Sequence, residues 1–137
     1  MGRKAAAAEK SDKKIMIVDD DENIRKTFAL ILKKKYDVAS AGDSKEALSS
    51  YKDGHFDLLI TDYKLPDQCG LDLVSKFRKI GYDGEVIMIT AFPDLVNLSE
   101  LSRLAISIFF VKPLDLDTLT QSIDRLMQPK PFLTGRF

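Results

Sequence analysis

The segment that most constrains the fold is an apolar run that ends abruptly in an acid and enters a loop with a proline and a glycine, Leu58-Leu59-Ile60-Thr61-Asp62-Tyr63-Lys64-Leu65-Pro66-Asp67-Gln68-Cys69-Gly70. A short continuous apolar run of this kind is typical of a strand that is buried on both faces, as strands are in parallel sheets. Open α/β sheets bind their ligands beyond the carboxyl ends of the strands. Asp62 therefore lies where we expect chemistry.

Three other apolar runs also end in polar residues: Lys14–Val18 before Asp19-Asp20-Asp21-Glu22, Glu85–Ile89 before Thr90-Ala91, and Ile106–Val111 before Lys112-Pro113. If all four runs are parallel strands of one sheet, their carboxyl ends lie along one edge. An acid pair, a single acid, a hydroxyl and an amine then converge at that edge. The ordered set is more informative than any one of its members.

Helical patterns alternate with the strands along the chain. We predict strands over Ile15–Val18, Val38–Ala41, Leu58–Thr61, Val86–Ile89 and Ile106–Val111. We predict helices over about Glu22–Lys35, Asp43–Lys52, Leu71–Gly81, Leu95–Leu104 and Leu116–Leu126, with Asp43 and Asp115 as caps. Five β-α units with short connections predict a single α/β domain. We expect a doubly wound, flavodoxin-like (βα)5 fold with a five-stranded parallel sheet of order 2-1-3-4-5.

Composition excludes several classes of protein. The 137 residues suffice for one domain, and the 21 basic and 21 acidic residues give no excess that would favour nucleic-acid binding. We see no apolar run long enough to cross a membrane and no signal peptide, and one cysteine cannot form an internal disulfide. These features point to the cytoplasm. Residues 1–13 read as a flexible arm, either native or a cloning remnant.

The strand-end residues favour magnesium-assisted phosphoryl chemistry. Clustered carboxylates repel one another and need a cation, and an oxygen-rich site suits Mg²⁺ better than zinc. Opposite the ion, Lys112 and the Thr90 hydroxyl would neutralise and bind phosphoryl oxygens. The chain has no glycine-rich phosphate cradle, which makes a phosphoryl group carried covalently on a carboxylate more probable than a bound nucleotide.

The ordered set of Val18-Asp19-Asp20, Asp62 with Pro66 and Gly70, Thr90-Ala91 and Lys112-Pro113 resembles the receiver domain of two-component response regulators. The resemblance covers residues 14–127, and residues 128–137 would be a C-terminal tail or the start of a linker. It implies that Asp62 accepts a phosphoryl group from a phosphohistidine of a sensor histidine kinase or histidine phosphotransfer protein. Lys112 would pair with the phosphoryl group.

The same resemblance implies a metal site and a switch. Asp20 and Asp62 would ligate Mg²⁺, Asp19 would orient a metal-bound water, and the backbone carbonyl of Lys64 would complete the shell. Thr90 and Phe109 would couple the phosphoryl group to an output surface formed by the last strand and the helices on either side of it. Partners would be a downstream protein or effector domain, with a phosphorylation-dependent dimer as one outcome. Such a domain is a phosphoacceptor with self-catalysed phosphorylation and dephosphorylation, not an enzyme, and it contacts neither nucleic acid nor membrane directly.

Some positions depart from the family pattern. Phe109 lacks the hydroxyl of the tyrosine often found there, and Cys69 stands where an acid or amide is common. The stretch 103–107, before the last strand, lacks the usual glycine and is more apolar, so the shape of the output surface is expected to depart from the family pattern. Lys64 and Phe92 lie at positions that vary in the family and tune dephosphorylation.

Four alternatives stay open at this point. Within the family, the chain could be a stand-alone regulator or a receiver taken from a longer regulator or hybrid kinase. An aspartyl-nucleophile phosphatase would use a related fold, but it usually has a second acid two residues after the nucleophile, where this chain has Lys64. A binding module that works without phosphorylation is the last alternative. Taken alone, the acidic run Asp19–Glu22 could also be explained as the cap and first turn of a helix.

Overall fold

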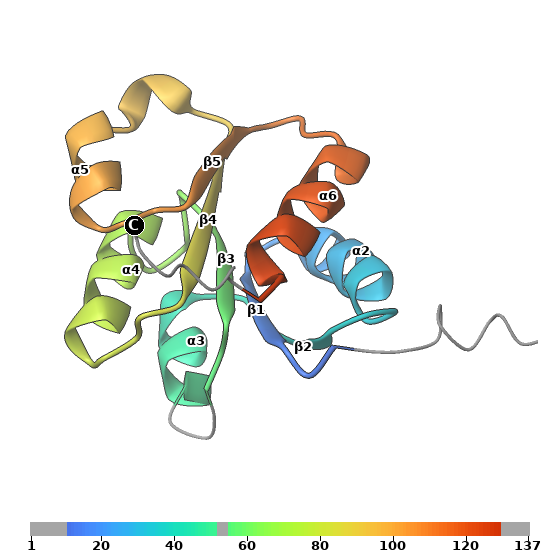
Figure 1. Cartoon of the computed structure of the whole chain (residues 1–137). Coiled ribbons are helices and arrows are strands. Elements are labelled where there is room, and N and C mark those ends of the chain that lie inside the picture. The colour runs from blue at the N-terminus through green and yellow to red at the C-terminus, as the bar shows by residue number, and fades with distance from the viewer. Residues whose placement is uncertain (1–10, 52–54, 130–137) are drawn as a thin grey trace, which may run out of the picture.

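Five parallel strands form one sheet in the described part of the chain, in the order β2-β1-β3-β4-β5. This computed structural model describes residues 11–51 and 55–129 (Figure 1). The strands are β1 (Lys14–Val18), β2 (Asp37–Ala41), β3 (Leu58–Asp62), β4 (Glu85–Thr90) and β5 (Ile108–Val111). The helices are α2 (Glu22–Leu32), α3 (Ser44–Tyr51), α4 (Gly70–Lys79), α5 (Leu98–Arg103) and α6 (Leu116–Met127), with a 3₁₀ turn η1 (Pro93–Leu95). The predicted fold class and strand order are confirmed.

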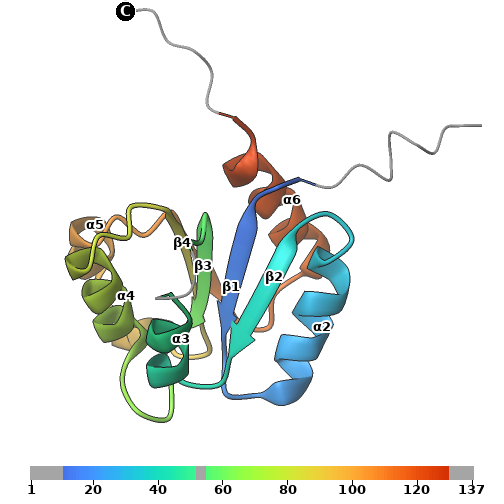
Figure 2. The same ribbon diagram turned by 90° about the horizontal axis from the view of Figure 1, so that it is seen from below.

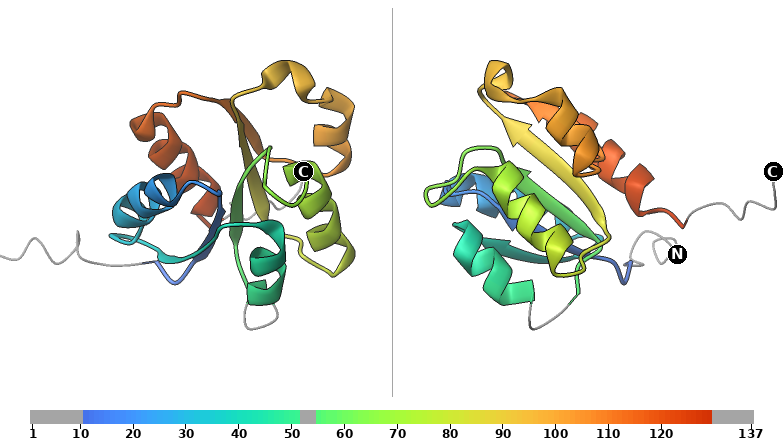
Figure 3. Two further views of the ribbon diagram at one scale, coloured as in Figure 1. Left: turned by 180° about the vertical axis from the view of Figure 1, so that it is seen from behind. Right: turned by 90° about the vertical axis from the view of Figure 1, so that its left-hand side faces the viewer.

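The helices cover both faces of the sheet. In Figures 1 and 2, α3, α4 and α5 lie on one face and α2 and α6 on the other, and Figure 3 shows α4 between α3 and α5. Successive side chains of a strand point to opposite faces, so Met16 packs toward the first helix layer while Ile15 and Ile17 pack toward the second. Two buried layers explain why the inner strands are apolar on both faces along most of their length, with polar residues at their ends.

Strand register brings the functional ends together. Val18 pairs with Thr61, so Asp19 leaves β1 at the level where Asp62 ends β3. Asp62 pairs with Ile89, and Thr90 pairs with Val111, directly before Lys112. The four strand ends therefore share one edge of the sheet.

Two helices end earlier in the sequence than predicted. The first long helix ends at Leu32, not near Lys35, because residues 33–35 turn the chain back toward β2. That turn buries Tyr36, whose hydroxyl donates to Asp124 Oδ1 at 2.6 Å. The helix predicted to end at Gly81 ends at Lys79, since Gly81 has a φ of +104°.

The prediction of one helix from Leu95 to Leu104 was wrong. Pro93–Leu95 form only a 3₁₀ turn, and α5 starts anew after Asn97, whose side chain accepts from the Ser99 N–H at 2.9 Å. The leucine spacing matched a helix, but Leu95 and Leu98 are 58% and 74% exposed. Local periodicity does not reveal a break that a capping side chain creates.

The following strand is shorter than predicted and begins at Ile108, not Ile106. The Ile106 N–H donates instead to the Leu101 carbonyl at 2.9 Å and so closes the end of α5. Residues 1–10 of the predicted arm and 130–137 of the predicted tail lie outside the described residues, as does the predicted helix end at Lys52. No helix in residues 11–51 and 55–129 is long and apolar enough to cross a bilayer.

Arg78 stabilises the turn before β5, where this sequence lacks the glycine that is usual in the family. Ala105 has a φ of +58°, a left-handed conformation that is unusual for a residue with a Cβ. Arg78 donates to the carbonyls of Leu104 at 3.0 Å and Ala105 at 3.0 Å. It also donates to the carbonyls of Tyr82 at 3.1 Å and Gly84 at 2.9 Å. One guanidinium on α4 thus fixes the turn that leads into β5.

Replacing Ala105 by glycine is expected to stabilise the protein. Relief of the left-handed strain, about 1–2 kcal/mol, exceeds the gain in unfolded-chain entropy of about 0.4–1 kcal/mol. Urea denaturation should show a free energy of unfolding higher by about 0.5–1 kcal/mol. The control Ala29→Gly, within α2, should lose about 1 kcal/mol. A loss in both variants would contradict the strain assigned to Ala105.

Candidate functional site

A lysine joins two acids at the carboxyl edge of the sheet. Lys112 Nζ lies 3.1 Å from Asp62 Oδ2 and 3.5 Å from Asp19 Oδ2. The side chains come from the ends of three different strands, as the sequence predicted. The Lys112–Pro113 peptide bond is cis, a feature that no pattern in the sequence indicated.

The predicted carboxylates form one cluster. Oxygens of Asp19, Asp20 and Asp62 all lie within 4.8 Å of one another. Asp19 is only 5% exposed, while Asp20 is exposed and the Asp62 side chain is 11% exposed. Three carboxylates facing one amine leave an excess of negative charge, and their oxygens suit a hard divalent cation. The next acid, Asp21, instead caps α2 by accepting from the Asn23 N–H at 2.9 Å.

Burial and charge change the pKa values of this cluster. Burial raises the pKa of Asp19, against the lowering effects of the Asp21 N–H and of Lys112. The charges of Asp62 and Asp20 raise it further, so the net shift is upward. Burial acts to lower the pKa of Lys112, but the hydrogen bond to Asp62 and the charge of Asp19 outweigh it, so that this pKa is raised. The lysine therefore stays charged beside the acids.

The loop after β3 closes tightly around its glycine. The Gly70 N–H donates to the Tyr63 carbonyl at 2.5 Å, and a Cβ on Gly70 would lie 2.3 Å from the Asp62 carbonyl oxygen. Only glycine allows this approach of backbone to backbone. The Lys64 N–H points to Asp62 Oδ1 at a long 3.5 Å. Gly70 thus explains how the loop returns beside the acid at the end of β3.

The two predicted switch residues lie inside the fold. Thr90 is 0% exposed, and its hydroxyl oxygen accepts from the Phe92 N–H at 2.8 Å. This bond uses a lone pair and leaves the hydroxyl proton free for another acceptor. Phe109 is half-buried and packs against the core beneath α3, α4 and α5.

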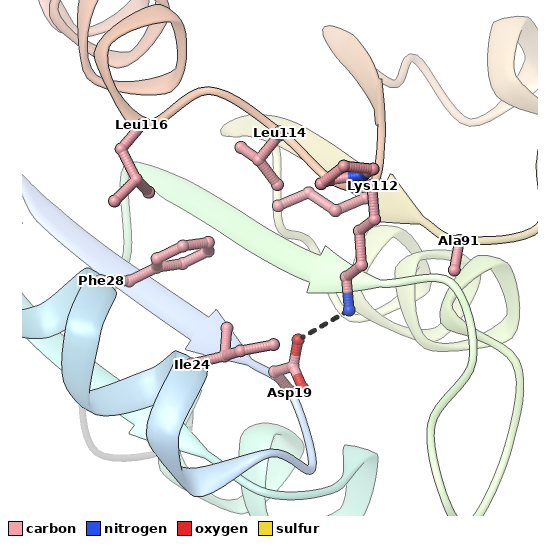
Figure 4. Close-up of a pocket in the computed structure, with 9 residues that line it drawn as sticks. Asp19, Ile24, Phe28, Ala91, Lys112, Leu114 and Leu116 are labelled. Carbon is pink, nitrogen blue, oxygen red and sulfur yellow. Dashed lines mark ion pairs between the residues drawn. The ribbon is translucent and has the colours of Figure 1, made fainter.

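Two hollows adjoin Lys112. A cleft of about 490 Å³ is lined by Asp20, Asp62, Lys64, Leu65, Pro66, Ala91, Phe92 and Lys112. Lys64 Nζ lies 4.9 Å from the centre of the Phe92 ring, so these two side chains meet at that cleft. A more apolar pocket of about 550 Å³ lies on the other side, where Lys112 reaches toward Asp19 between side chains of α2 and of the segment before α6 (Figure 4).

Sequence reasoning did not identify several residues around the site. Arg25 Nη1 donates to the Asp19 carbonyl at 2.6 Å, and Asp67 in the loop after β3 contacts the start of α3. An arginine in a helix and an acid in a loop carry no local signal of such contacts. Cys69 precedes α4 without a side-chain capping bond. His55 is exposed, and its Nε2 lies 3.3 Å from Asp57 Oδ1.

The chain matches the response regulator receiver domain family over residues 15–124. It is 36% identical over 114 residues to the response regulator protein PilR of Pseudomonas aeruginosa, which covers 82% of this chain but 26% of PilR. It is 28% identical to sporulation initiation phosphotransferase F of Bacillus subtilis, over 87% of this chain and 97% of that protein.

A solved structure agrees with these relatives. The response regulator TrrA of Thermotoga maritima, in complex with Mg²⁺-BeF, has 32% identity and a TM-score of 0.72, over 84% of this chain and 99% of that one. The chain spans about a quarter of PilR and nearly all of phosphotransferase F. The sheet order and the residues at the strand ends agree with a receiver domain, the class that the family match and these relatives show. The chain belongs to the response regulator receiver family of two-component signalling.

Neutralising the buried acid should stabilise the protein when Mg²⁺ is absent. Because the folded pKa of Asp19 lies above its unfolded value, the native state binds that proton more tightly and loses stability as the pH rises. This loss of stability is absent below pH 3.8, the ordinary pKa of the carboxyl group, and is complete above the raised pKa of Asp19 in the folded protein. Asp19→Asn, which keeps an acceptor for the Asp21 N–H, should therefore have a higher free energy of unfolding than the wild type at pH 7.

Urea denaturation in EDTA at several pH values measures this difference. The advantage of Asp19→Asn over the wild type should shrink as the pH falls toward 4. The exposed acid Asp12, which lies before β1 and outside any helix, supplies the control, because Asp12→Asn should track the wild type at every pH. An advantage of Asp19→Asn that stays constant with pH would contradict the assignment.

Proposed function

We propose that Asp62 is the phosphoacceptor of this receiver and that its donor is a phosphohistidine of a sensor histidine kinase or histidine phosphotransfer protein. The observation that carries the proposal is the Asp62 carboxylate itself. It lies in an open cleft, 3.1 Å from Lys112 and within 4.8 Å of the Asp19 and Asp20 carboxylates. Nucleophile, counter-charge and a set of hard oxygen ligands thus occur together.

In the proposed transfer, an Asp62 carboxylate oxygen attacks the phosphorus. The new O–P bond forms as the P–N bond of the phosphohistidine breaks, and the imidazole leaves with the bonding pair. Asp20, Asp62 and the Lys64 carbonyl would hold Mg²⁺, with Asp19 acting through a water. Bound Mg²⁺ would neutralise phosphoryl oxygens. Lys112, held ready by the two acids, would bind a further phosphoryl oxygen.

The proposed switch runs through Thr90. Its free hydroxyl proton can donate to a phosphoryl oxygen on Asp62, and its oxygen already holds the Phe92 N–H at 2.8 Å. A movement of Thr90 toward the phosphoryl group would therefore pull on the segment that leads into η1 and α5. Phe109, packed against the core behind this segment, would follow. Phosphorylation would in this way shift the population of two conformations of the α5-β5-α6 surface.

That surface suits a protein partner. Leu95, Leu98 and Val111 are 58%, 74% and 44% exposed, so apolar side chains are available there for a partner to cover. The partner would be a downstream protein, an effector domain or a second copy of the chain. We propose that residues 14–127 act as the receiver unit, in the cytoplasm where such kinases transfer their phosphoryl groups, whether alone or within a longer regulator.

Intact-protein mass spectrometry after incubation with acetyl phosphate and Mg²⁺ tests the phosphoacceptor. The wild type should gain one phosphoryl group, and EDTA or Asp62→Asn should prevent the gain. Asp72→Asn, an exposed acid on α4, is the matched control and should be labelled like the wild type. Release of many phosphates per protein would indicate a phosphatase instead. Absence of any label from both acetyl phosphate and a phosphorylated histidine kinase would overturn the proposal in favour of a binding module.

Mg²⁺ is expected to stabilise the folded protein, since the unfolded chain does not gather the three acids. At a free Mg²⁺ concentration ten times the dissociation constant, the gain should be about 1.4 kcal/mol. Thermal unfolding with and without Mg²⁺ measures it. Asp20→Asn should lose most of this gain, whereas Asp43→Asn, an exposed cap of α3, should keep it. An equal response of the two variants would remove Asp20 from the proposed ligand set.

A further inference from the structure

Asp67 links the loop after β3 to a helix that is distant in sequence. Its Oδ2 accepts from the Ser44 hydroxyl at 2.6 Å and from the Lys45 N–H at 3.2 Å, and its Oδ1 accepts from the Ser44 N–H at 3.1 Å. Gln68 Nε2 adds a bond to the Ser44 hydroxyl oxygen at 2.6 Å. Two successive loop residues are thereby tied to the first residues of α3.

These bonds cap α3 from outside its own segment, because Asp67 accepts from two N–H groups of the first turn that Asp43 does not reach. Asp43 precedes the helix and already accepts from the Glu46 N–H at 2.8 Å, which is the contact of an ordinary cap. Asp67 comes from another element, 23 residues away from Ser44. Ser44 is buried, which makes it a fixed point for the loop. The hydroxyl of Ser44 also lowers the pKa of Asp67, so its carboxylate is charged and a strong acceptor.

The loop that Asp67 holds is the loop that faces Asp62. The Lys64 N–H points to Asp62 Oδ1 at 3.5 Å. Two backbone bonds, from Leu65 N–H to the Gln68 carbonyl at 3.2 Å and from Gly70 N–H to the Tyr63 carbonyl, close the loop upon itself. Such a closed loop moves largely as one piece. Its apolar anchor is the buried Leu65, and its polar anchor is Asp67.

We propose that Asp67 is a positioning residue for the phosphorylation site, because it fixes the Lys64 segment against α3 and so sets the placement of the Lys64 carbonyl and the Asp62 carboxylate around the divalent cation. This rests on the proposed function. Asp67 touches neither the cation nor the phosphoryl group. It acts by holding ligand atoms in place before the cation arrives, which lowers the cost of ordering them.

The test compares Asp67→Ala with Asp43→Ala. Both variants remove a carboxylate that accepts from N–H groups at the start of α3, but only the first releases the loop. NMR titration with MgCl₂ gives the dissociation constant. We expect Asp67→Ala to weaken Mg²⁺ binding by about tenfold and Asp43→Ala to change it less than about twofold. Asp67→Asn, which retains one acceptor oxygen, should fall between Asp67→Ala and the wild type.

Amide hydrogen exchange in EDTA supplies a readout that does not depend on the metal. The Leu65 and Gly70 amides should exchange faster in Asp67→Ala than in Asp43→Ala, while amides of the central strand β3 should match in both. A wild type that binds no Mg²⁺ and takes no phosphoryl group would refute the proposed function itself. If the wild type binds Mg²⁺ and the two variants Asp67→Ala and Asp43→Ala have equal dissociation constants for it, only the positioning role is refuted.

Discussion

Three carboxylates within 4.8 Å of one another repel, and the parallel sheet holds them there because β1 and β3 are neighbours that end at the same level. The cost falls most heavily on Asp19, which is buried and has a raised pKa. Lys112 offsets part of it with ion pairs to Asp19 and Asp62. The site is therefore built to gain stability from an added cation, and its other features follow from keeping these charges in place.

Two connections extend from this cluster to the rest of the fold. One passes through the loop after β3, which Gly70 allows to close and Asp67 ties to α3. The other begins at the end of β4, where the Thr90 hydroxyl holds the Phe92 N–H and the chain continues into η1 and α5. We propose that the first connection holds the ligands of a cation in place and that the second carries a conformational change outward.

Local patterns predicted the fold well where each element was buried on a fixed face. The meeting of Asp19, Asp62 and Lys112 was predicted from apolar runs and their polar ends, which are local features, and the strand order from the common topology of such α/β folds; both are confirmed. The prediction of one helix over Leu95–Leu104 was wrong because it used only the leucine spacing. That spacing carries no information about the Asn97 cap, which divides the segment. The roles assigned to Thr90 and Phe109 remain predictions.

By itself the sequence determined which residues end each strand, and hence which side chains share an edge of the sheet, since a parallel sheet aligns all its carboxyl ends. Only the tertiary structure decided how that edge is held. Arg78 bonds to the Ala105 carbonyl 27 residues away, and Asp67 to Ser44 at a separation of 23 residues. Such contacts join polar groups from unrelated segments. Any exposed arginine or aspartate could make them, and only the packing of helices on the sheet selects the partner.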